Sequence, residues 1–156
     1  MRLETLGYVN VYRYVAGKVE WLSNGLPAEG KLASELRIGA IAHTNVATCR
    51  LDQQVGEVEG DHGLCVVVNE QCIVLGDLRG KSLQIDPRTS VEQAMDPAPS
   101  TYRPNVSVKK MAHHMLESGA RKVLVADSDG RLVGWLSFED VLSALDPQSA
   151  AHSGNA

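Results

Sequence analysis

The chain has 156 residues, enough for one ordinary domain or two small repeats with a buried core. Its 44% hydrophobic and 22% charged residues are typical of a globular protein and exclude a disordered chain. The net charge of −4 argues against a general nucleic-acid-binding protein, since such proteins are basic. No apolar run approaches the roughly 18 residues of a membrane helix. The first residues also lack an apolar signal region, so we expect no membrane partner and a cytoplasmic location.

Cysteine and histidine are spaced in ways that do not suggest a metal site. Cys49, Cys65 and Cys72 fit neither a Cys-x-x-Cys pair nor a zinc ribbon, so we expect reduced, packed thiols. The five histidines are scattered, and we expect them to face solvent. Neither a P-loop nor a Gly-x-Gly-x-x-Gly motif occurs, so the common phosphate-binding and dinucleotide-binding motifs are absent from the sequence.

The first part of the chain predicts several short elements. A helical piece is expected at residues 34–41 and a second helix at residues 54–60. The apolar residues of 66–76 flank a polar centre, which predicts a β-hairpin. Residues 85–89 then form a link to the second part.

The second part carries the clearest pattern. Another short helical piece is expected at residues 90–95, and residues 100–103 are extended. Ser107 can cap a following helix, and Gly119 supplies a left-handed stop. One face of that helix is apolar at helical spacing and contains Val108, Met111, Ala112, Met115 and Leu116.

A hairpin and a helix complete this part. Residues 122–126 and 131–136 read as strands, joined by an Asp- and Gly-containing turn at 127–130. Ser137 opens a helix through residue 142.

The two parts form an internal repeat. Residues 48–50 precede Val55 as residues 101–103 precede Val108, an offset of 53, and the hairpins match without a gap at an offset of 58. The first repeat must therefore have the shorter helix, by more than one turn. One repeat is too small to bury its sheet face, so we predict two stacked repeats with clefts where they meet. The fold class is mixed α/β (α+β), two pseudo-symmetric repeats of a short sheet packed with helices, plus a short N-terminal extension.

The second repeat resembles a CBS domain, the module named after cystathionine β-synthase. The resemblance runs through about 50 residues and rests on 101–104, Ser107 and Val108 with Met115, 119–123, Asp129 and Gly130, and 134–140. Both repeats together are similar to a tandem CBS pair, or Bateman module. The resemblance implies a first, degenerate CBS repeat at residues 34–86, a second at 89–146 and a disordered tail at 147–156.

The resemblance also implies a function. Tandem CBS pairs bind an adenosine-containing ligand (AMP, ADP, ATP or S-adenosylmethionine) between the repeats, and they act as regulatory sensors and not as enzymes. It further implies a homodimer and no catalytic cofactor. The alternative is a ligand-free structural or protein-interaction dimer, because half of the site is degenerate. The regulated partner is not readable from the sequence.

The ligand motif of the family is Gly, two residues, Ser or Thr, two residues, then Asp, and here it is matched by Gly134, Ser137 and Asp140. Free amides at a helix start attract phosphate, and an Asp one turn later can accept ribose hydroxyls. The same Ser and Asp also fit a helix capping box, and both roles can hold together. Trp135 is expected to be a core or dimer contact.

Further ligand-binding residues follow from the resemblance. They are Thr101, Arg103, Lys122 and Val123. In the first repeat, Arg79 falls at the Ser/Thr place and Ser82 at the Asp place, which leaves no motif carboxylate for the ribose. Arg79 can instead neutralise phosphates, or it is a surface or salt-bridged arginine.

Residues 1–30 resemble the C-terminal end of a rhodanese, a sulfurtransferase with a cysteine nucleophile. The resemblance rests on residues 6–12, 17–22 and 25–30. This segment contains no cysteine, so we expect no sulfurtransferase activity from it, although an enzyme fragment by descent is a third alternative. We expect a strand at 9–14 and a helix at 18–23 that cover the CBS pair or a dimer interface.

Overall fold

The computed structural model describes residue 7, residue 9 and residues 35–146. The predicted N-terminal strand and helix, the rhodanese-like segment and the tail from residue 147 lie outside the described residues. Within this part of the chain, no helix is long and apolar enough to cross a bilayer.

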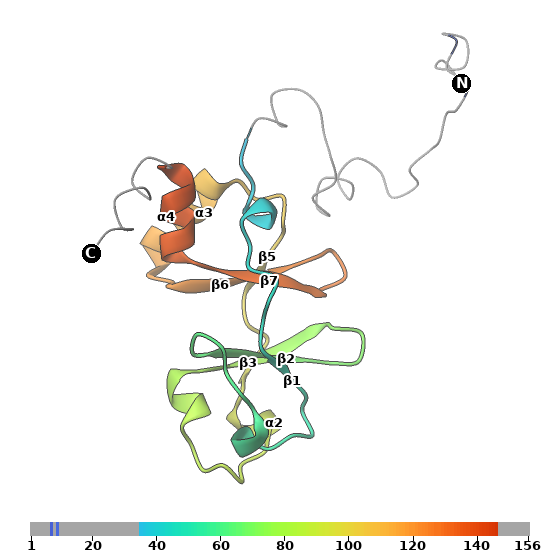
Figure 1. Cartoon of the computed structure of the whole chain (residues 1–156), viewed down its shortest axis with the longest axis vertical. Helices are drawn as coiled ribbons and strands as arrows, with labels where there is room; N and C mark the ends of the chain where they lie inside the picture. Colours follow the sequence, from blue (N-terminus) through green and yellow to red (C-terminus); the bar gives the residue numbers. More distant parts are fainter. Residues whose placement is uncertain (1–6, 8, 10–34, 147–156) are drawn as a thin grey trace.

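Two small sheets face each other (Figure 1). The first has the order β1-β2-β3-β4 and the second the order β5-β6-β7. Their strands are β1 (Thr48–Cys49), β2 (Leu64–Val68), β3 (Val74–Arg79), β4 (Asp96–Pro97), β5 (Thr101–Tyr102), β6 (Lys122–Ala126) and β7 (Leu132–Ser137). Each sheet combines an antiparallel hairpin with a short parallel strand beside it. The mixed fold class is confirmed.

The helices lie on the outer faces of the two sheets, with α3 and α4 over the second and α2 beside the first (Figure 1). The described elements are η2 (Ile38–Ala40), η3 (Val55–Glu57), η4 (Gly80–Leu83), α2 (Val91–Ala94), α3 (Val108–Ser118) and α4 (Phe138–Leu145). Ser107 caps α3 by accepting from the Lys110 amide, and Gly119 ends it at a φ of 68°. Both ends were predicted. Leu116 was expected on the buried face but is 65% exposed.

The strand register confirms the internal repeat. Thr48 pairs with Val66 as Thr101 pairs with Leu124, and both hairpins shift register at the same repeat position. The predicted helix at 54–60 is wrong in type, because the structure has only the 3₁₀ turn η3 there. Gly56 and Gly60 disfavour a longer helix, and a side chain at Gly56 would meet the Pro87 Cβ at 2.7 Å. The link at 85–89 therefore occupies the space of a longer helix.

The segment before each repeat packs on the other repeat. Ile38 of η2 is fully buried against α3, and its amide donates to the Val106 carbonyl at 2.9 Å. Val91 of α2 is buried against the first sheet, and its amide donates to the Gln53 carbonyl at 2.9 Å. The helical piece expected at 90–95 is present as α2, whereas the one expected at 34–41 is only the 3₁₀ turn η2. Both segments tie the repeats together. The repeat boundaries at 34–86 and 89–146 stay predictions.

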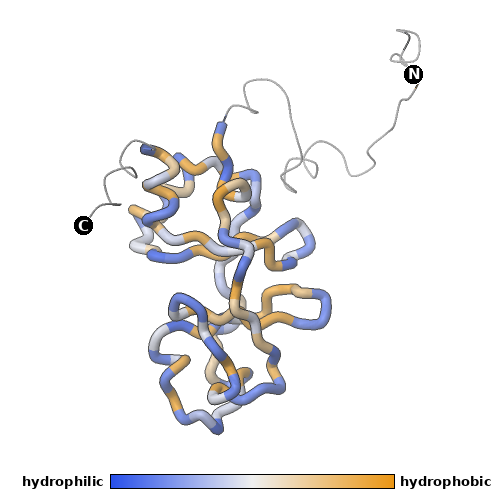
Figure 2. Tube along the Cα trace, in the orientation of Figure 1, coloured by the Kyte–Doolittle hydropathy of each residue, from blue (hydrophilic) through white to orange (hydrophobic). Residues whose placement is uncertain are grey.

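The core between the sheets joins residues of both repeats. It contains Leu64, Val66, Val68, Leu124 and Trp135. Figure 2 shows hydrophobic residues along the hairpins that face each other. Burial of Trp135 in this core confirms the sequence prediction for that residue. Cys49 and Cys65 are buried free thiols, as predicted, whereas Cys72 is exposed.

The shared core predicts that trimming one central side chain destabilises the protein. Leu124 is fully buried, so Leu124→Ala should lower the free energy of unfolding by about 2–5 kcal/mol. Ile85→Ala is the matched control, because Ile85 is exposed in the link. Urea unfolding measures both. An equal loss in the two variants would contradict the shared core.

Candidate functional site

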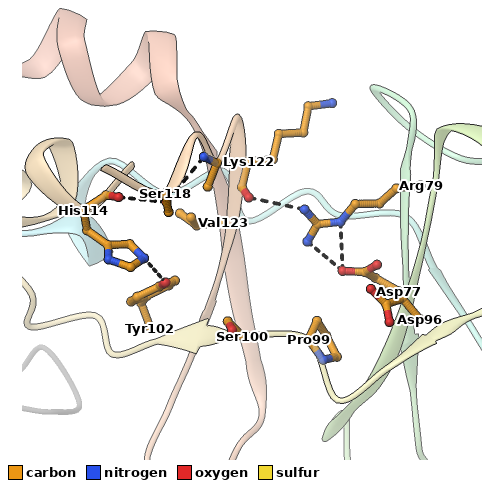
Figure 3. A pocket seen from close by; sticks show the side chains of 11 residues that line it. Asp77, Arg79, Asp96, Pro99, Ser100, Tyr102, His114, Ser118, Lys122 and Val123 are labelled. Atoms are coloured by element: carbon orange, nitrogen blue, oxygen red, sulfur yellow. Dashed lines mark hydrogen bonds and ion pairs between the residues drawn. The ribbon is translucent and has the colours of Figure 1, made fainter. Parts of the chain in front are cut away.

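A cavity of about 420 Å³ opens where the two repeats meet, and we name it the Asp77 cavity (Figure 3). Its size suits a small organic ligand. It is lined by Asp77, Arg79, Asp96, Pro99, Ser100, Tyr102, His114, Ser118, Ala120, Lys122 and Val123. β3 and β4 of the first sheet and β5, α3 and β6 of the second repeat supply the lining residues that lie in helices and strands.

Asp77 and Arg79 form the charged wall of this cavity. The Asp77 side chain is only 4% exposed, and its Oδ2 accepts from the Arg79 Nε at 2.8 Å and contacts Nη2 at 2.6 Å. Arg79 also donates from Nη1 to the Lys122 carbonyl at 3.3 Å, so it spans the two repeats. Burial raises the pKa of Asp77 more than Arg79 lowers it, and the Asp96 charge raises it further. A nearly buried carboxyl group with a perturbed pKa, located in a cleft, is typical of a functional site.

The opposite wall comes from the second repeat. The Tyr102 hydroxyl forms a hydrogen bond with the His114 Nε2, and their rings lie 5.1 Å apart. Ser118 donates to the His114 carbonyl at 2.8 Å. Val123 is buried and supplies apolar surface. This wall thus combines a polar rim with an apolar strand.

Eight of the eleven lining residues were missed by sequence reasoning. The four with acidic or aromatic side chains are Asp77, Asp96, Tyr102 and His114. The first repeat has no carboxylate at the motif position, but Asp77, which follows Gly76 directly, brings a carboxylate to the cavity. A carboxylate inside the apolar strand 74–78 was the signal in the sequence. The four described histidines are exposed as predicted, yet three of them line a cavity.

Some of the predicted ligand residues do meet in this cavity. Arg79 and Val123 line it, and Lys122 contributes its backbone. Thr101 is exposed and lies between two lining residues without lining the cavity itself. Arg103 is exposed and donates to the Ser128 carbonyl at 3.3 Å, outside the cavity.

The motif residues Ser137 and Asp140 lie elsewhere. They form the capping box of α4, in which Ser137 Oγ accepts from the Asp140 amide at 3.1 Å. Asp140 Oδ2 accepts from the Ser137 amide at 2.8 Å and lies 3.0 Å from the His43 Nε2. Burial acts to raise the pKa of Asp140, but the Ser137 hydrogen bonds and His43 outweigh it and lower that pKa. Neither residue lines the Asp77 cavity, so the predicted site residues do not form one cluster.

A second cavity of about 390 Å³ lies near Asp140, and we name it the Trp135 cavity. It is lined by Ala42, His43, Thr44, Asn45, Asp61, His62 and Trp135. The Lys122 side chain reaches this side, where its Nζ donates to the His62 carbonyl and lies 5.2 Å from the Trp135 ring centroid. At the repeat offset of 58, Trp135 takes the place of Asp77. An indole therefore stands here where the Asp77 cavity has a carboxylate.

Metal ligands do not cluster in either cavity. Among residues 35–146, no group of three or more His, Cys, Asp or Glu side chains is placed to hold a metal ion.

The capping box predicts a pH-dependent loss of stability. Because the folded pKa of Asp140 is lowered, its contribution is present above the unfolded pKa of about 3.9 and is lost as the pH falls through the folded pKa. Asp140→Asn should therefore lower the free energy of unfolding by about 1 kcal/mol at neutral pH. This loss in the free energy of unfolding should become smaller at acidic pH. Glu139→Gln, in the same exposed helical turn, is the control, and a deficit independent of pH would refute the assignment.

Comparison with known proteins gives one family match. Residues 90–147 match the CBS domain. The protein YtoI of Bacillus subtilis (strain 168), itself uncharacterized, is 34% identical over 88 residues. That match covers 56% of this chain and 20% of the relative, so the chain spans about a fifth of that relative's length.

Solved structures share the arrangement of both repeats. The cytosolic domain of the Mg²⁺ channel MgtE in complex with ATP is 25% identical with a TM-score of 0.64, covering 72% of this chain and 51% of that one. The CBS domain pair of protein MJ0100, in complex with 5′-methylthioadenosine and S-adenosyl-L-methionine, is 16% identical with a TM-score of 0.60. That match covers 73% of this chain and 98% of the other.

Proposed function

We propose that this chain, which has the fold of a CBS pair and a CBS domain at residues 90–147, is a regulatory module that binds one adenosine-containing ligand in the Asp77 cavity. The observation that carries the proposal is the Asp77 carboxylate, nearly buried at the junction of the repeats. A ligand held there contacts both repeats at once. Its binding would therefore favour one relative arrangement of the repeats, which is what a sensor requires.

The chemistry of the lining supports an adenosine moiety. Carboxylates such as Asp77 and Asp96 can accept hydrogen bonds from the two ribose hydroxyls. The apolar surface of Val123 and Ala120 suits the flat face of an adenine. The ligands of the MgtE domain and of the MJ0100 pair share only their adenosine part, which is why we propose this class.

The chemistry of the Trp135 cavity supports a single site per chain. At about 390 Å³ it is nearly as large as the Asp77 cavity, but its indole, only 7% exposed and part of the central core, stands at the repeat position of the Asp77 carboxylate. His43, at the repeat position of Asp96, is joined to Asp140 and lies against the indole. We therefore propose that Ser137 and Asp140 act as a helix cap and not as ligand contacts. We propose no ligand contact for Thr101 or Arg103.

The runner-up function is a ligand-free interaction module. It is favoured by the exposed leucines of α3 and α4, which are Leu116, Leu142 and Leu145. We propose that these leucines form a homodimer contact whether or not a ligand binds, and that the protein has no catalytic activity.

Calorimetric titration of the full chain with adenosine tests the proposed site. We expect one site per chain, and Asp77→Asn should weaken binding about 10- to 150-fold, because hydrogen bonds to a charged acceptor are worth about 1.5–3 kcal/mol. The raised pKa of Asp77 means that its charge is disfavoured in the fold, so this variant should lose little stability at neutral pH.

Asp52→Asn is the matched control, since Asp52 is exposed and lies outside both cavities. It should bind as the unchanged protein does. Two equal sites per chain, or undiminished binding by Asp77→Asn, would place the ligand elsewhere. An absence of binding would favour the ligand-free interaction module.

The exposed leucines predict the assembly. Light scattering at tens of micromolar should return a dimer mass, because burying such side chains is worth about 1.5–3 kcal/mol each. Combined Leu116→Glu and Leu142→Glu substitutions should shift the protein to monomer. Leu36→Glu is the control, since Leu36 is an exposed leucine outside both helices. A monomer mass for the unchanged chain rejects the dimer.

A further inference from the structure

We infer that the Asp77 cavity selects nucleosides whose 5′ substituent is uncharged or positively charged over nucleotides that carry phosphate. The inference rests on the proposed function and narrows its ligand class. A sulfonium nucleoside is the positively charged case, and ATP is the strongest negative case.

The fixed charges of the lining carry the inference. The described lining contains two acidic residues, Asp77 and Asp96, and two basic residues, Arg79 and Lys122. The Lys122 ammonium contacts the His62 carbonyl and lies near the Trp135 ring, so two carboxylates and one guanidinium remain as the charged groups at the cavity. This balance favours cations over anions.

Arg79 is already engaged. Its Nε and Nη2 lie 2.8 and 2.6 Å from one Asp77 oxygen, and its Nη1 donates to the Lys122 carbonyl at 3.3 Å (Figure 3). The guanidinium has five N–H groups, and these contacts leave two of them for a further acceptor. Its positive charge is already shared with the nearly buried Asp77 carboxylate, which weakens its attraction for a phosphate.

Lys122 does not supply the missing positive charge. Lys122 belongs to the lining of the Asp77 cavity, but its side chain extends away from Tyr102 and Ser118 (Figure 3). Its ammonium donates to the His62 carbonyl and lies 5.2 Å from the Trp135 ring centroid. The ammonium therefore lies beside two residues that line the Trp135 cavity.

The helix at this cavity adds to the same preference. His114 and Ser118 lie in the C-terminal half of α3, and Ser118 is its last residue. The C-terminal end of a helix carries partial negative charge, whereas phosphates are bound at the N-terminal end. At the described lining of the Asp77 cavity, α3 therefore offers a phosphate the unfavourable end of a helix, and the Arg79 guanidinium is already paired with Asp77.

The test is calorimetric titration of the full chain at about pH 8, without divalent cations. The probes are adenosine, S-adenosylmethionine, AMP and ATP. We expect S-adenosylmethionine to bind at least about tenfold more tightly than ATP, with AMP weaker than adenosine. Asp96→Asn removes one negative charge from the lining and should narrow the ratio between S-adenosylmethionine and ATP severalfold. Asp52→Asn changes the net charge equally outside the cavity and should leave that ratio as it is.

Each outcome decides the inference. The expected order of affinities, together with a smaller ratio between S-adenosylmethionine and ATP affinity in Asp96→Asn, supports the inference. Binding of AMP or ATP as tight as that of adenosine overturns it while leaving the proposed function standing. A ratio unchanged in Asp96→Asn, or narrowed equally in Asp52→Asn, also overturns it. Failure of all four probes to bind overturns the proposed function and this inference together.

Discussion

Neither sheet of this protein can bury its inner face alone, and the fold follows from that constraint. The hairpins of both repeats contribute to one central core, with Leu64 and Val66 on one side and Leu124 and Trp135 on the other. The segments that carry Ile38 and Val91 cross to the opposite repeat and fix how the sheets stack. Because the repeats are related but not identical, the two cavities at their junction have similar positions and different chemistry.

That difference traces to one strand position. The first repeat has Asp77 where the second has Trp135, and each side chain points from the hairpin toward the junction. A carboxylate offers hydrogen-bond acceptors to a ligand, whereas an indole extends the core. The Arg79 guanidinium beside Asp77 then links the repeats through the Lys122 carbonyl. A ligand in the Asp77 cavity would act on the contact that joins the two halves, which is the physical basis for a regulatory role.

The sequence predicted what local chemistry determines. Ser107 and Gly119 mark the ends of α3, and the matched hairpins mark the strands, because capping and alternation are short-range signals. The prediction of a helix at 54–60 was wrong because the link around Pro87 occupies the space of that helix, which is a tertiary effect. The site was harder to predict, since the Lys122 side chain extends away from the cavity that its strand lines. The motif residues Ser137 and Asp140 form a helix cap beside His43, outside the Asp77 cavity. Such side-chain directions depend on packing between repeats, which spacing along the chain does not encode.

The central claim is that the ligand occupies the Asp77 cavity and not the cavity beside Asp140. Histidine side chains distinguish the two, because His114 lines the first and His43 and His62 line the second. Side-chain imidazole NMR signals of the full chain, followed during titration with adenosine, report on each cavity separately. We predict that the His114 signal shifts to saturation while the signals of His43 and His62 stay in place. Saturable shifts of His43 and His62 with an unmoved His114 signal would contradict the account.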